Sequence, residues 1–386
     1  MKQIICSEKI PIKLWLDNIE PGAMEQARNL ANLPFSFGHI AIMPDAHQGY
    51  GMPIGGVLAT LGVVVPNGVG VDIGCGVCAV RTSREHLDHQ SLKQILAGIR
   101  ENIPVGFKHH SSPQDKKLMP ETLGEMPIVE AEFQNGLKQL GTLGGGNHFI
   151  EIQQGDDGFI WLMIHSGSRN IGYRVAAHYN KLAENLCRGQ KGAVPKQWQL
   201  ASLPLLSNDG RNYLREMNYC VNFALANRNL MMERTKEIVQ EIAGPVEFGS
   251  TINVAHNYAA EETHYGRNLV IHRKGATRAF AGEPGIIPGS QGSKSYLVRG
   301  KGNEESFRSC AHGAGRRLGR KQAQRELDLD LEIGRLDRMG VIHSIRKRQD
   351  LDEAAGAYKD IETVLNDQQD LVEIATELTP LAVVKG

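Results

Sequence analysis

The sequence contains little cysteine and no excess of either charge. Six cysteines among 386 residues show no spacing typical of a disulfide framework, so we expect reduced thiols. Lys plus Arg and Asp plus Glu number 43 each. This balance does not indicate a nucleic-acid-binding protein, although such binding needs only a local basic surface. Composition therefore leaves the partner open.

Long hydrophobic runs are also absent from the sequence. No stretch approaches the roughly 20 apolar residues of a membrane helix, and residues 1–15 lack an apolar segment followed by a small-residue cleavage site. We therefore expect a soluble, cytoplasmic protein with no membrane partner. The sequence also lacks a Walker-type GxxxxGK[ST] motif, internal repeats and low-complexity tracts. A P-loop protein and a repeat architecture are thereby excluded.

The apolar residues that are present suffice for a folded enzyme core. Hydrophobic residues make up 41% of the chain, whose length suits one large domain or two smaller ones. Apolar segments predict buried strands within 54–81, 159–164 and 269–273. Helical patterns cover 91–101, 173–187, 213–242, 315–327 and 359–377. Because strands and helices do not alternate regularly, the pattern favours an α+β fold. The polar segments 104–127 and 188–211 are predicted surface loops.

Several glycine-rich segments also contain side chains that bind metals. Asp72 and Cys75 share the turn GVDIGCG, and His148, His165 and His256 lie in three further segments. A single buried histidine is more often satisfied by a hydrogen bond than bound to metal. One carboxylate, one thiolate and three imidazoles together suit Mn, Fe, Co or Zn, and five ligands suggest two ions that share the thiolate. Cys78 is interpreted as a small buried apolar residue.

A second group of residues suits phosphate chemistry. His312 lies in SCAHGAGR, a glycine-rich turn predicted to open a basic helix that carries Arg316 and Arg317. A helix N-terminus with arginines holds phosphate, and a neutral histidine there can attack phosphorus. The alternative is that His312 only caps the turn. The segment GIIPGSQGSKSY at 285–296 offers backbone and hydroxyl donors that suit a nucleotide.

Together these segments resemble the RtcB family of tRNA-splicing and RNA-repair ligases, from about residue 39 to the C-terminus. The resemblance is carried by HIAIMPDAHQGYG at 39–51, GVGVDIGCG at 68–76, LGTLGGGNHFIE at 140–151, HSGSRNIG at 165–172, HNY at 256–258, IIPGSQGSKSYLVRG at 286–300, GNEESF at 302–307, SCAHGAGR at 309–316, AYKDI at 357–361 and the terminal VKG. The chain departs from the family pattern at 46–50 and at Gln291, where Met is common.

The resemblance implies a single compact α+β domain over residues 1–386, with mixed sheets around a buried metal site and flanking helices. It implies an RNA ligase that uses GTP and two Mn²⁺ ions, in which His312 takes GMP and Cys75 bridges the ions. Asp72 and His148 would complete one ion's ligands, and His165 and His256 the other's. The implied guanylate pocket comprises Asn147, His148, Glu151, His256, Asn257, Pro288, Ser290, Gly292, Glu305, His312, Gly313, Ala314, Gly315, Tyr358 and Lys385.

The partner implied by the resemblance is RNA with a 3′-phosphate or 2′,3′-cyclic phosphate on one end and a 5′-hydroxyl on the other. Arg169, Arg316 and Arg317 are candidates for phosphate contacts, the alternative being solvated surface arginines. An archease-type activator is a further candidate partner, and we expect a monomer. Two rival readings remain open, namely a metal-dependent phosphodiesterase or other hydrolase without a GTP requirement, and an RNA-end-binding paralogue that does not ligate.

Overall fold

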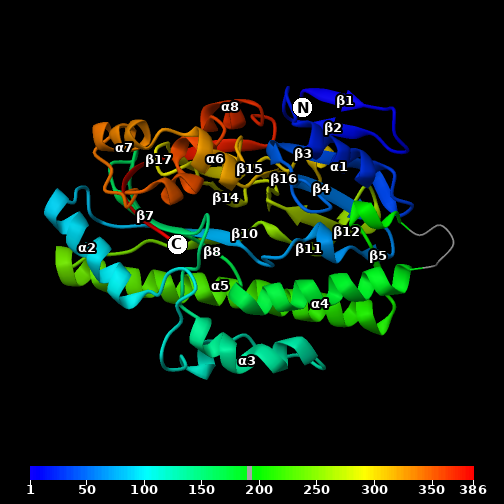
Figure 1. The fold of residues 1–386 in the computed structure, drawn as a ribbon, viewed down its shortest axis with the longest axis horizontal. Helices are drawn as coiled ribbons and strands as arrows, with labels where there is room; N and C mark the ends of the chain where they lie inside the picture. Colours follow the sequence, from blue (N-terminus) through cyan, green and yellow to red (C-terminus); the bar gives the residue numbers. More distant parts are fainter. Residues whose placement is uncertain (189–193) are drawn as a thin grey trace.

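Two β-sheets form the middle of the protein, with helices on both sides (Figure 1). The computed structural model describes residues 1–188 and 194–386. In these ranges the first sheet has the order β1 (Gln3–Ile5), β2 (Ile12–Leu14), β3 (Ser36–His47), β4 (Ile54–Thr60), β12 (Arg267–Lys274) and β11 (Asn257–His264). Strands β2 and β3 are parallel, and the other neighbours in this sheet are antiparallel.

The second sheet is antiparallel throughout. Its order is β10 (Ile252–Ala255), β6 (Gly76–Arg81), β8 (Ile160–Ser166), β7 (Phe149–Gly155), β17 (Val372–Lys385), β15 (Ser295–Gly300) and β14 (Pro284–Ile287). Every residue of β8 is buried. Two short pairs join β13 (Ala276–Arg278) to β16 (Ser309–Ala311) and β5 (Val63–Val64) to β9 (Leu203–Pro204).

Long helices cover one side of the sheets, and α3 lies outermost beneath them in Figure 1. The α-helices are α1 (Pro21–Ala31), α2 (His89–Asn102), α3 (Pro127–Gln139), α4 (Arg169–Cys187), α5 (Asn208–Ala243), α6 (Arg320–Glu326), α7 (Leu329–Arg338) and α8 (Ile361–Asn366). Short 3₁₀ turns occupy Pro66–Gly68, Lys116–Leu118, Lys196–Trp198, Glu304–Ser306, Arg348–Glu353 and Ala355–Ala357.

Helix α5 contributes to two of the apolar cores. Its side chain Phe223 joins a core with Leu137 of α3 and Val175 of α4. Met231, further along the helix, joins Ile164 of β8 in a second core. Ser207 caps the helix by accepting a hydrogen bond from the Gly210 N–H, which satisfies one of the amides that a helix start leaves free. This helix therefore supports the strands that carry the site described below.

The structure confirms the α+β class and the predicted helices at 91–101, 173–187 and 213–242, with ends shifted by a few residues. The buried strands predicted within 54–81, 159–164 and 269–273 are present as β4, β6, β8 and β12. The loop predicted at 104–127 contains only one 3₁₀ turn between regular elements. Part of the loop predicted at 188–211, residues 189–193, lies outside the described residues.

Two predicted helices were wrong in part. The helix predicted at 315–327 begins only at Arg320, because Gly315 has φ +72° and Arg316 forms an isolated β-bridge with Tyr358. The helix predicted at 359–377 ends at Asn366 as α8, and residues 372–385 form β17 instead. Strand β17 hydrogen-bonds to both β7 and β15, so tertiary pairing decides its conformation.

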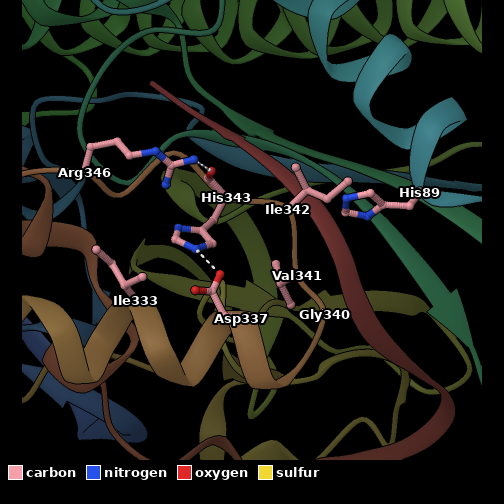
Figure 2. Close-up of a pocket in the computed structure, with 8 residues that line it drawn as sticks. All are labelled: His89, Ile333, Asp337, Gly340, Val341, Ile342, His343 and Arg346. Carbon is pink, nitrogen blue, oxygen red and sulfur yellow. Dashed lines mark hydrogen bonds and ion pairs between the residues drawn. The ribbon is translucent and has the colours of Figure 1, made fainter.

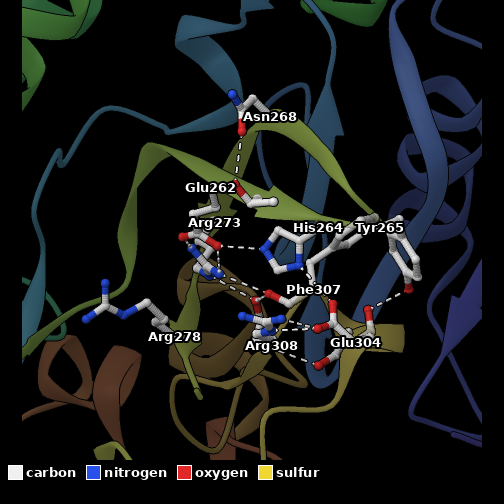
Figure 3. A network of polar contacts seen from close by, with 12 residues as sticks. Glu262, His264, Tyr265, Asn268, Arg273, Arg278, Glu304, Phe307 and Arg308 are labelled. Carbon is white, nitrogen blue, oxygen red and sulfur yellow. Dashed lines mark hydrogen bonds and ion pairs between the residues drawn. The ribbon is translucent and has the colours of Figure 1, made fainter. Parts of the chain in front are cut away.

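A partly buried polar network connects the first sheet to β16 (Figure 3). Its charged members, called here the Arg273 network, are Glu262, His264, Arg273, Glu304 and Arg308. The Arg273 guanidinium donates to both Glu262 carboxylate oxygens at 2.5 and 3.0 Å, to the Phe307 carbonyl at 3.0 Å and to the Ser309 hydroxyl at 2.9 Å. These bonds fix the start of β16, whose last residue precedes His312.

No helix in residues 1–188 and 194–386 is long and apolar enough to cross a membrane.

Candidate active site

The predicted metal-binding side chains meet at one edge of the second sheet. Cys75 directly precedes β6, His148 directly precedes β7, and His165 lies near the end of β8. Because neighbouring strands are antiparallel, these strand ends fall on the same edge, and the registers Gly76–Ser166 and Phe149–His165 align them. His256 lies between β10 and β11, where the chain passes from one sheet to the other, and its N–H donates to the Cys75 carbonyl at 2.8 Å.

The turn that carries Asp72 and Cys75 depends on glycine. Gly74 has φ +74°, and a Cβ there would lie 2.7 Å from the Val221 Cα of α5. Only a residue without a side chain allows this close approach of turn and helix. The Cys75 N–H donates to the Asp72 carbonyl at 3.2 Å, which closes the turn.

The ligand atoms of three residues lie close enough for a shared metal ion. The Cys75 Sγ is 3.5 Å from His148 Nε2 and 3.3 Å from His165 Nε2. The same His148 Nε2 is 3.1 Å from the Asp72 Oδ2. Cys75, His148 and His165 offer atoms that all lie within 4.8 Å of one another, and all three residues are buried. The thiolate and imidazole donors suit a borderline divalent ion. With Asp72 and His256, these residues are called the Cys75 cluster.

Four imidazoles form a row that leads from this cluster to His312. The ring centroids of His148 and His165 are 5.3 Å apart, those of His165 and His256 5.2 Å, and those of His256 and His312 4.7 Å. Burial and the neighbouring histidines hold the pKa values of His165 and His256 well below the ordinary range. Both rings are therefore neutral near pH 7, the form in which imidazole binds a metal.

At the Asp72 end of the cluster, the pKa values of a thiol and a carboxyl group are shifted. Burial and the adjacent Asp72 carboxylate raise the pKa of the Cys75 thiol well above its ordinary value. Burial, the largest single influence, would raise the pKa of Asp72, but His148, Cys75 and Arg169 together outweigh burial and lower that pKa. A bound cation favours a thiolate. In the absence of a cation the Cys75 thiol keeps its proton, and a divalent metal held by this donor set would stabilise the thiolate.

His312 is held by a carboxylate that the sequence interpretation did not single out. The Asp45 Oδ2 accepts from the His312 backbone N–H at 3.0 Å and lies 2.5 Å from the ring Nδ1. Asp45 is completely buried near the end of β3. A carboxylate accepts only, so the proton is assigned to Nδ1, and Nε2 keeps its lone pair. This is the tautomer that a histidine nucleophile requires at Nε2.

His312 does not lie at a helix N-terminus as predicted. Residues 313–319 separate it from Arg320, where α6 begins. The turn at 312–315 instead packs on the 288–292 segment, where the Ala314 N–H donates to the Pro288 carbonyl at 3.1 Å. A Cβ on Gly313 would lie 3.2 Å from that same carbonyl oxygen. The two segments predicted for nucleotide binding are therefore neighbours.

The Glu353 carboxylate accepts hydrogen bonds from residues that follow the 312–315 turn and from Tyr358. This carboxylate accepts from Arg316 Nη1 at 3.1 Å, from Arg320 Nε at 3.0 Å and from the Tyr358 hydroxyl. The Glu353 backbone carbonyl accepts from the Gln291 amide at 3.0 Å. Within the predicted nucleotide-binding segment 285–296, the Ser290 and Ser293 hydroxyls lie 2.9 Å apart, and the Gly292 N–H donates to Ser290 Oγ at 3.3 Å.

Lys385, the penultimate residue, is half-buried beside the cluster and is not part of a solvated tail. It pairs with Phe149 in the β17–β7 register, and the Gly386 N–H donates to the His148 carbonyl at 3.0 Å. Burial lowers the pKa of Lys385, although Glu353 and Glu151 oppose this effect. Burial raises the pKa of Glu151 to about 8. Two buried ionisable groups with opposed shifts are typical of functional sites.

The two predicted asparagines lie beside the cluster and make backbone contacts there. The Asn257 side chain donates to the Asp72 carbonyl at 3.1 Å and accepts from the Gly275 N–H at 2.7 Å. The Asn147 carbonyl lies 3.2 Å from His165 Nδ1. A bond of this kind fixes the orientation of a ligand imidazole.

Glu305 is the predicted pocket residue that the structure places elsewhere. Its carboxylate contacts Lys13, and its carbonyl lies 2.7 Å from His39 Nε2. His39 and Asp45 are six residues apart in β3, which corresponds to roughly 20 Å at about 3.3 Å per residue. Glu305 therefore lies near the opposite end of β3 from His312.

The three predicted RNA-binding arginines have different surroundings. Arg169 is half-buried and donates to the Thr142 hydroxyl and the Gly106 carbonyl, both at 3.1 Å. The Arg316 side chain donates hydrogen bonds to the Glu353 carboxylate and to the Asp352 and Leu318 carbonyls. Arg317 is exposed and donates to the Gly356 carbonyl at 2.8 Å. Of the three, Arg317 has the side chain most accessible to solvent.

A cavity of about 510 Å³ lies outside these segments (Figure 2). It is lined by His89, Ile333, Asp337, Gly340, Val341, Ile342, His343 and Arg346. The His343 ring is already engaged on both sides, with Asp337 Oδ1 at 3.3 Å and the Ile345 N–H at 3.3 Å. Asp337, His343 and Arg346 have protein partners, so the cavity is a weaker candidate centre than the Cys75 cluster.

Sequence reasoning missed three polar residues that support the site. Asp45 contacts the His312 ring, and the Glu353 carboxylate accepts from Arg316. Arg228 of α5 donates to the Gly74 and Ser166 carbonyls at 2.9 and 2.8 Å. The signal for Asp45 was a carboxylate that interrupts the apolar segment HIAIMP. Arg228 lies within a helical pattern, where neighbouring residues alone do not reveal burial.

Comparison with known proteins supports a common ancestry over the whole chain. Residues 26–133 and 121–386 match the family described as tRNA-splicing ligase RtcB. The chain is 37% identical to the RNA-splicing ligase RtcB of Escherichia coli K12, covering 100% of this chain and 99% of that protein. It is 33% identical to the tRNA-splicing ligases RtcB of Methanococcus maripaludis and Thermococcus kodakarensis, covering 98% and 94% of this chain and 95% and 91% of theirs. The chain therefore belongs to the RtcB family.

Proposed function

We propose that the protein is a GTP- and Mn²⁺-dependent RNA ligase that joins an RNA 3′-phosphate or 2′,3′-cyclic phosphate end to a 5′-hydroxyl end. The observation that carries the proposal is the row of imidazoles from the Cys75 cluster to His312, whose Nδ1 is held by Asp45. This arrangement puts a neutral nitrogen nucleophile one ring away from a candidate metal centre. Family membership supports RNA as the substrate class.

The residues of the cluster divide naturally between two ions. Cys75 contacts both His148 and His165, which suits a bridging thiolate. Asp72 and His148 would hold one ion, and His165 and His256 the other. When bound, the ions would neutralise charge on the phosphoryl oxygens. The surrounding residues would hold the imidazoles in their neutral form and exclude water.

His312 would carry the covalent step. Its Nε2 attacks the α-phosphorus of GTP, so that an N–P bond forms and the bond to the pyrophosphate oxygen breaks. The Asp45 carboxylate keeps the proton on Nδ1 and offsets the positive charge that develops on the ring. The product is a histidine that carries GMP and free pyrophosphate.

Transfer to RNA would follow in two displacements. An oxygen of the RNA 3′-phosphate attacks the GMP phosphorus, and the N–P bond to His312 breaks. The 5′-hydroxyl of the second RNA end then attacks the RNA phosphorus, loses its proton, and displaces GMP. A 2′,3′-cyclic phosphate would first be opened by water to the 3′-phosphate. GMP serves as the leaving group because the unmodified phosphate oxygen is too basic to leave.

The guanylate would lie between the 288–292 turn, the 312–315 turn and the end of β17. Ser290, Gly292, Tyr358 and Lys385 line this region through the contacts described above. Glu305 joins the pocket only if the segments around it rearrange, and we assign it a position outside the pocket. Of the three arginines, we favour Arg317 for RNA phosphate and give Arg169 and Arg316 supporting roles. We retain a monomer, a cytoplasmic location and an archease-type activator as proposals.

The test is covalent labelling with α-³²P-GTP and Mn²⁺, followed by a denaturing gel. We expect an acid-labile, alkali-stable label on the wild type and none on His312→Ala. His272→Ala is a matched control, because His272 is a buried β12 histidine that contacts backbone groups at Val65 and Leu58. An unlabelled wild type would instead favour the hydrolase or the non-ligating paralogue.

A further inference from the structure

Phe107 is an aromatic side chain that is 100% exposed in the loop after α2. Single exposed apolar residues are common on protein surfaces, so the exposure by itself carries no functional meaning. What distinguishes Phe107 is the combination of a fixed backbone and a position next to the Cys75 cluster.

The backbone around Phe107 is held on both sides. The Gly106 N–H donates to the Gly144 carbonyl at 2.7 Å, and the Lys108 N–H donates to the Val105 carbonyl at 3.2 Å. Val105 and Gly144 also form an isolated parallel bridge. The loop therefore presents an exposed ring from a fixed backbone, so that little backbone entropy is lost when the ring binds a partner.

The loop lies one side chain away from the metal-binding residues. Arg169 Nη2 donates to the Gly106 carbonyl at 3.1 Å. A Cβ on Gly144 would lie 2.1 Å from Arg169 Nη1 and 2.6 Å from His148 Nδ1. The Arg169 guanidinium is thus in contact with the Phe107 loop on one side and close to His148 on the other.

The residues that follow Phe107 are polar and basic. Lys108 and His109 are both exposed. An aromatic ring followed by cationic side chains is the combination by which proteins bind single-stranded nucleic acid, in which bases stack on the ring and cations meet the phosphates. A base within a duplex already stacks on both faces, so this surface suits an unpaired RNA end.

We propose that Phe107 stacks on an unpaired base close to the RNA end bound at the Cys75 cluster, and that Lys108 contacts the adjoining phosphate. The proposal rests on the proposed function for the identity of the ligand as RNA. It adds a recognition residue that acts on RNA and not on GTP. The preferred substrate would therefore have at least one unpaired nucleotide at its 3′-phosphate end.

The test measures binding of a single-stranded RNA with a 3′-phosphate by fluorescence anisotropy. We expect Phe107→Ala to weaken binding about tenfold, from the usual contribution of one stacked base, and Phe107→Trp to bind nearly as well as the wild type. Leu206→Ala is the matched control, because Leu206 is 87% exposed in the connection between β9 and α5. A 2-aminopurine placed in turn at each of the last nucleotides should be quenched by the wild type at one position and not by Phe107→Ala.

Two results would overturn the stacking proposal. Equal RNA affinity of Phe107→Ala and wild type would do so, and would leave a protein partner as the occupant of this surface. A matching loss of labelling with α-³²P-GTP in Phe107→Ala would show that the residue acts through the loop on the site. Labelling needs no RNA, so an unlabelled wild type that still binds RNA through Phe107 would contradict the ligase proposal alone.

Discussion

The Cys75 cluster and the Arg273 network are both polar and both contain buried histidines, but they differ in how their groups are paired. In the Arg273 network, the Arg273 guanidinium faces Glu262, and both His264 nitrogens face carboxylates of Glu262 and Glu304 at 2.9 and 3.2 Å. In the Cys75 cluster, imidazoles face a thiol and one another, and His148 Nδ1 has no partner within the described residues. The polar groups of the Arg273 network are paired with one another, whereas the Cys75 cluster leaves a buried ring nitrogen without a partner in the part of the chain that the structure describes.

This difference separates a structural role from a functional one. Buried polar groups normally find partners, so unsatisfied donors and acceptors identify a place where a ligand completes the arrangement. His264 and Arg273 are as buried as His165 and His256, so burial alone does not distinguish the two regions. We therefore expect substitutions in the Cys75 cluster to alter activity and metal binding, and substitutions in the Arg273 network to alter stability.

The largest effect is expected for Cys75→Ala. Loss of the shared thiolate should lower Mn²⁺ affinity and labelling by α-³²P-GTP at least about 1,000-fold, because loss of even a residue that only orients a ligand costs about 10- to 100-fold. Metal titration by calorimetry and the labelling rate provide the measurements. The apo variant should unfold at a temperature close to that of the apo wild type. A variant that binds Mn²⁺ normally would show that Cys75 is not a ligand.

Glu262→Gln should have the opposite effect to Cys75→Ala, because it should alter stability and not metal binding or labelling. Burial would raise the pKa of Glu262, but His264 and Arg273 lower it to about 2. The charged carboxylate therefore stabilises the fold fully above about pH 4.5, and this contribution is lost as the pH falls toward 2. The variant should lose about 3 kcal/mol at neutral pH, measured by urea denaturation, and show a weaker dependence on acid. Unchanged stability would contradict a structural role.

Asp45→Asn tests the contact between the Asp45 carboxylate of β3 and the ring of His312. The amide oxygen still accepts a hydrogen bond but no longer offsets charge on the His312 ring, so the labelling rate should fall about 10- to 100-fold. The KM for GTP should change little, because Asp45 contacts His312 and not the nucleotide. A fall in thermal stability with an unchanged rate would assign Asp45 a purely structural role.

The sequence predicted the chemistry of the site better than its geometry. The motifs with Asp72, Cys75 and the histidines lie at strand ends, where glycines allow tight turns, and this pattern is local. The strand order that brings those ends to one edge depends on pairings such as β17 with β7, which join residues far apart in sequence. For the same reason, the first part of β17, residues 372–377, was predicted as the end of a helix.

Polar residues that act over long distances were the hardest to predict. Asp45 contacts a histidine 267 positions away, and Arg228 reaches the Gly74 carbonyl 154 positions away. Neither has a spacing motif that local reasoning can detect. In contrast, Lys385 was predicted near the guanylate through the family resemblance, and the structure places it beside Phe149 and His148.

Cys78→Ala gives the smallest expected effect and the closest control for Cys75. The two cysteines are three residues apart, both are buried, and burial raises the pKa of Cys78 to about 12. Cys78 lies within β6, where its neighbours are apolar side chains and its thiol approaches the Arg228 carbonyl at 3.9 Å. The substitution should cost about 1 kcal/mol of stability through a small cavity and leave the label largely intact. Loss of the label in a folded Cys78→Ala protein would contradict the assignment of a purely structural role to Cys78.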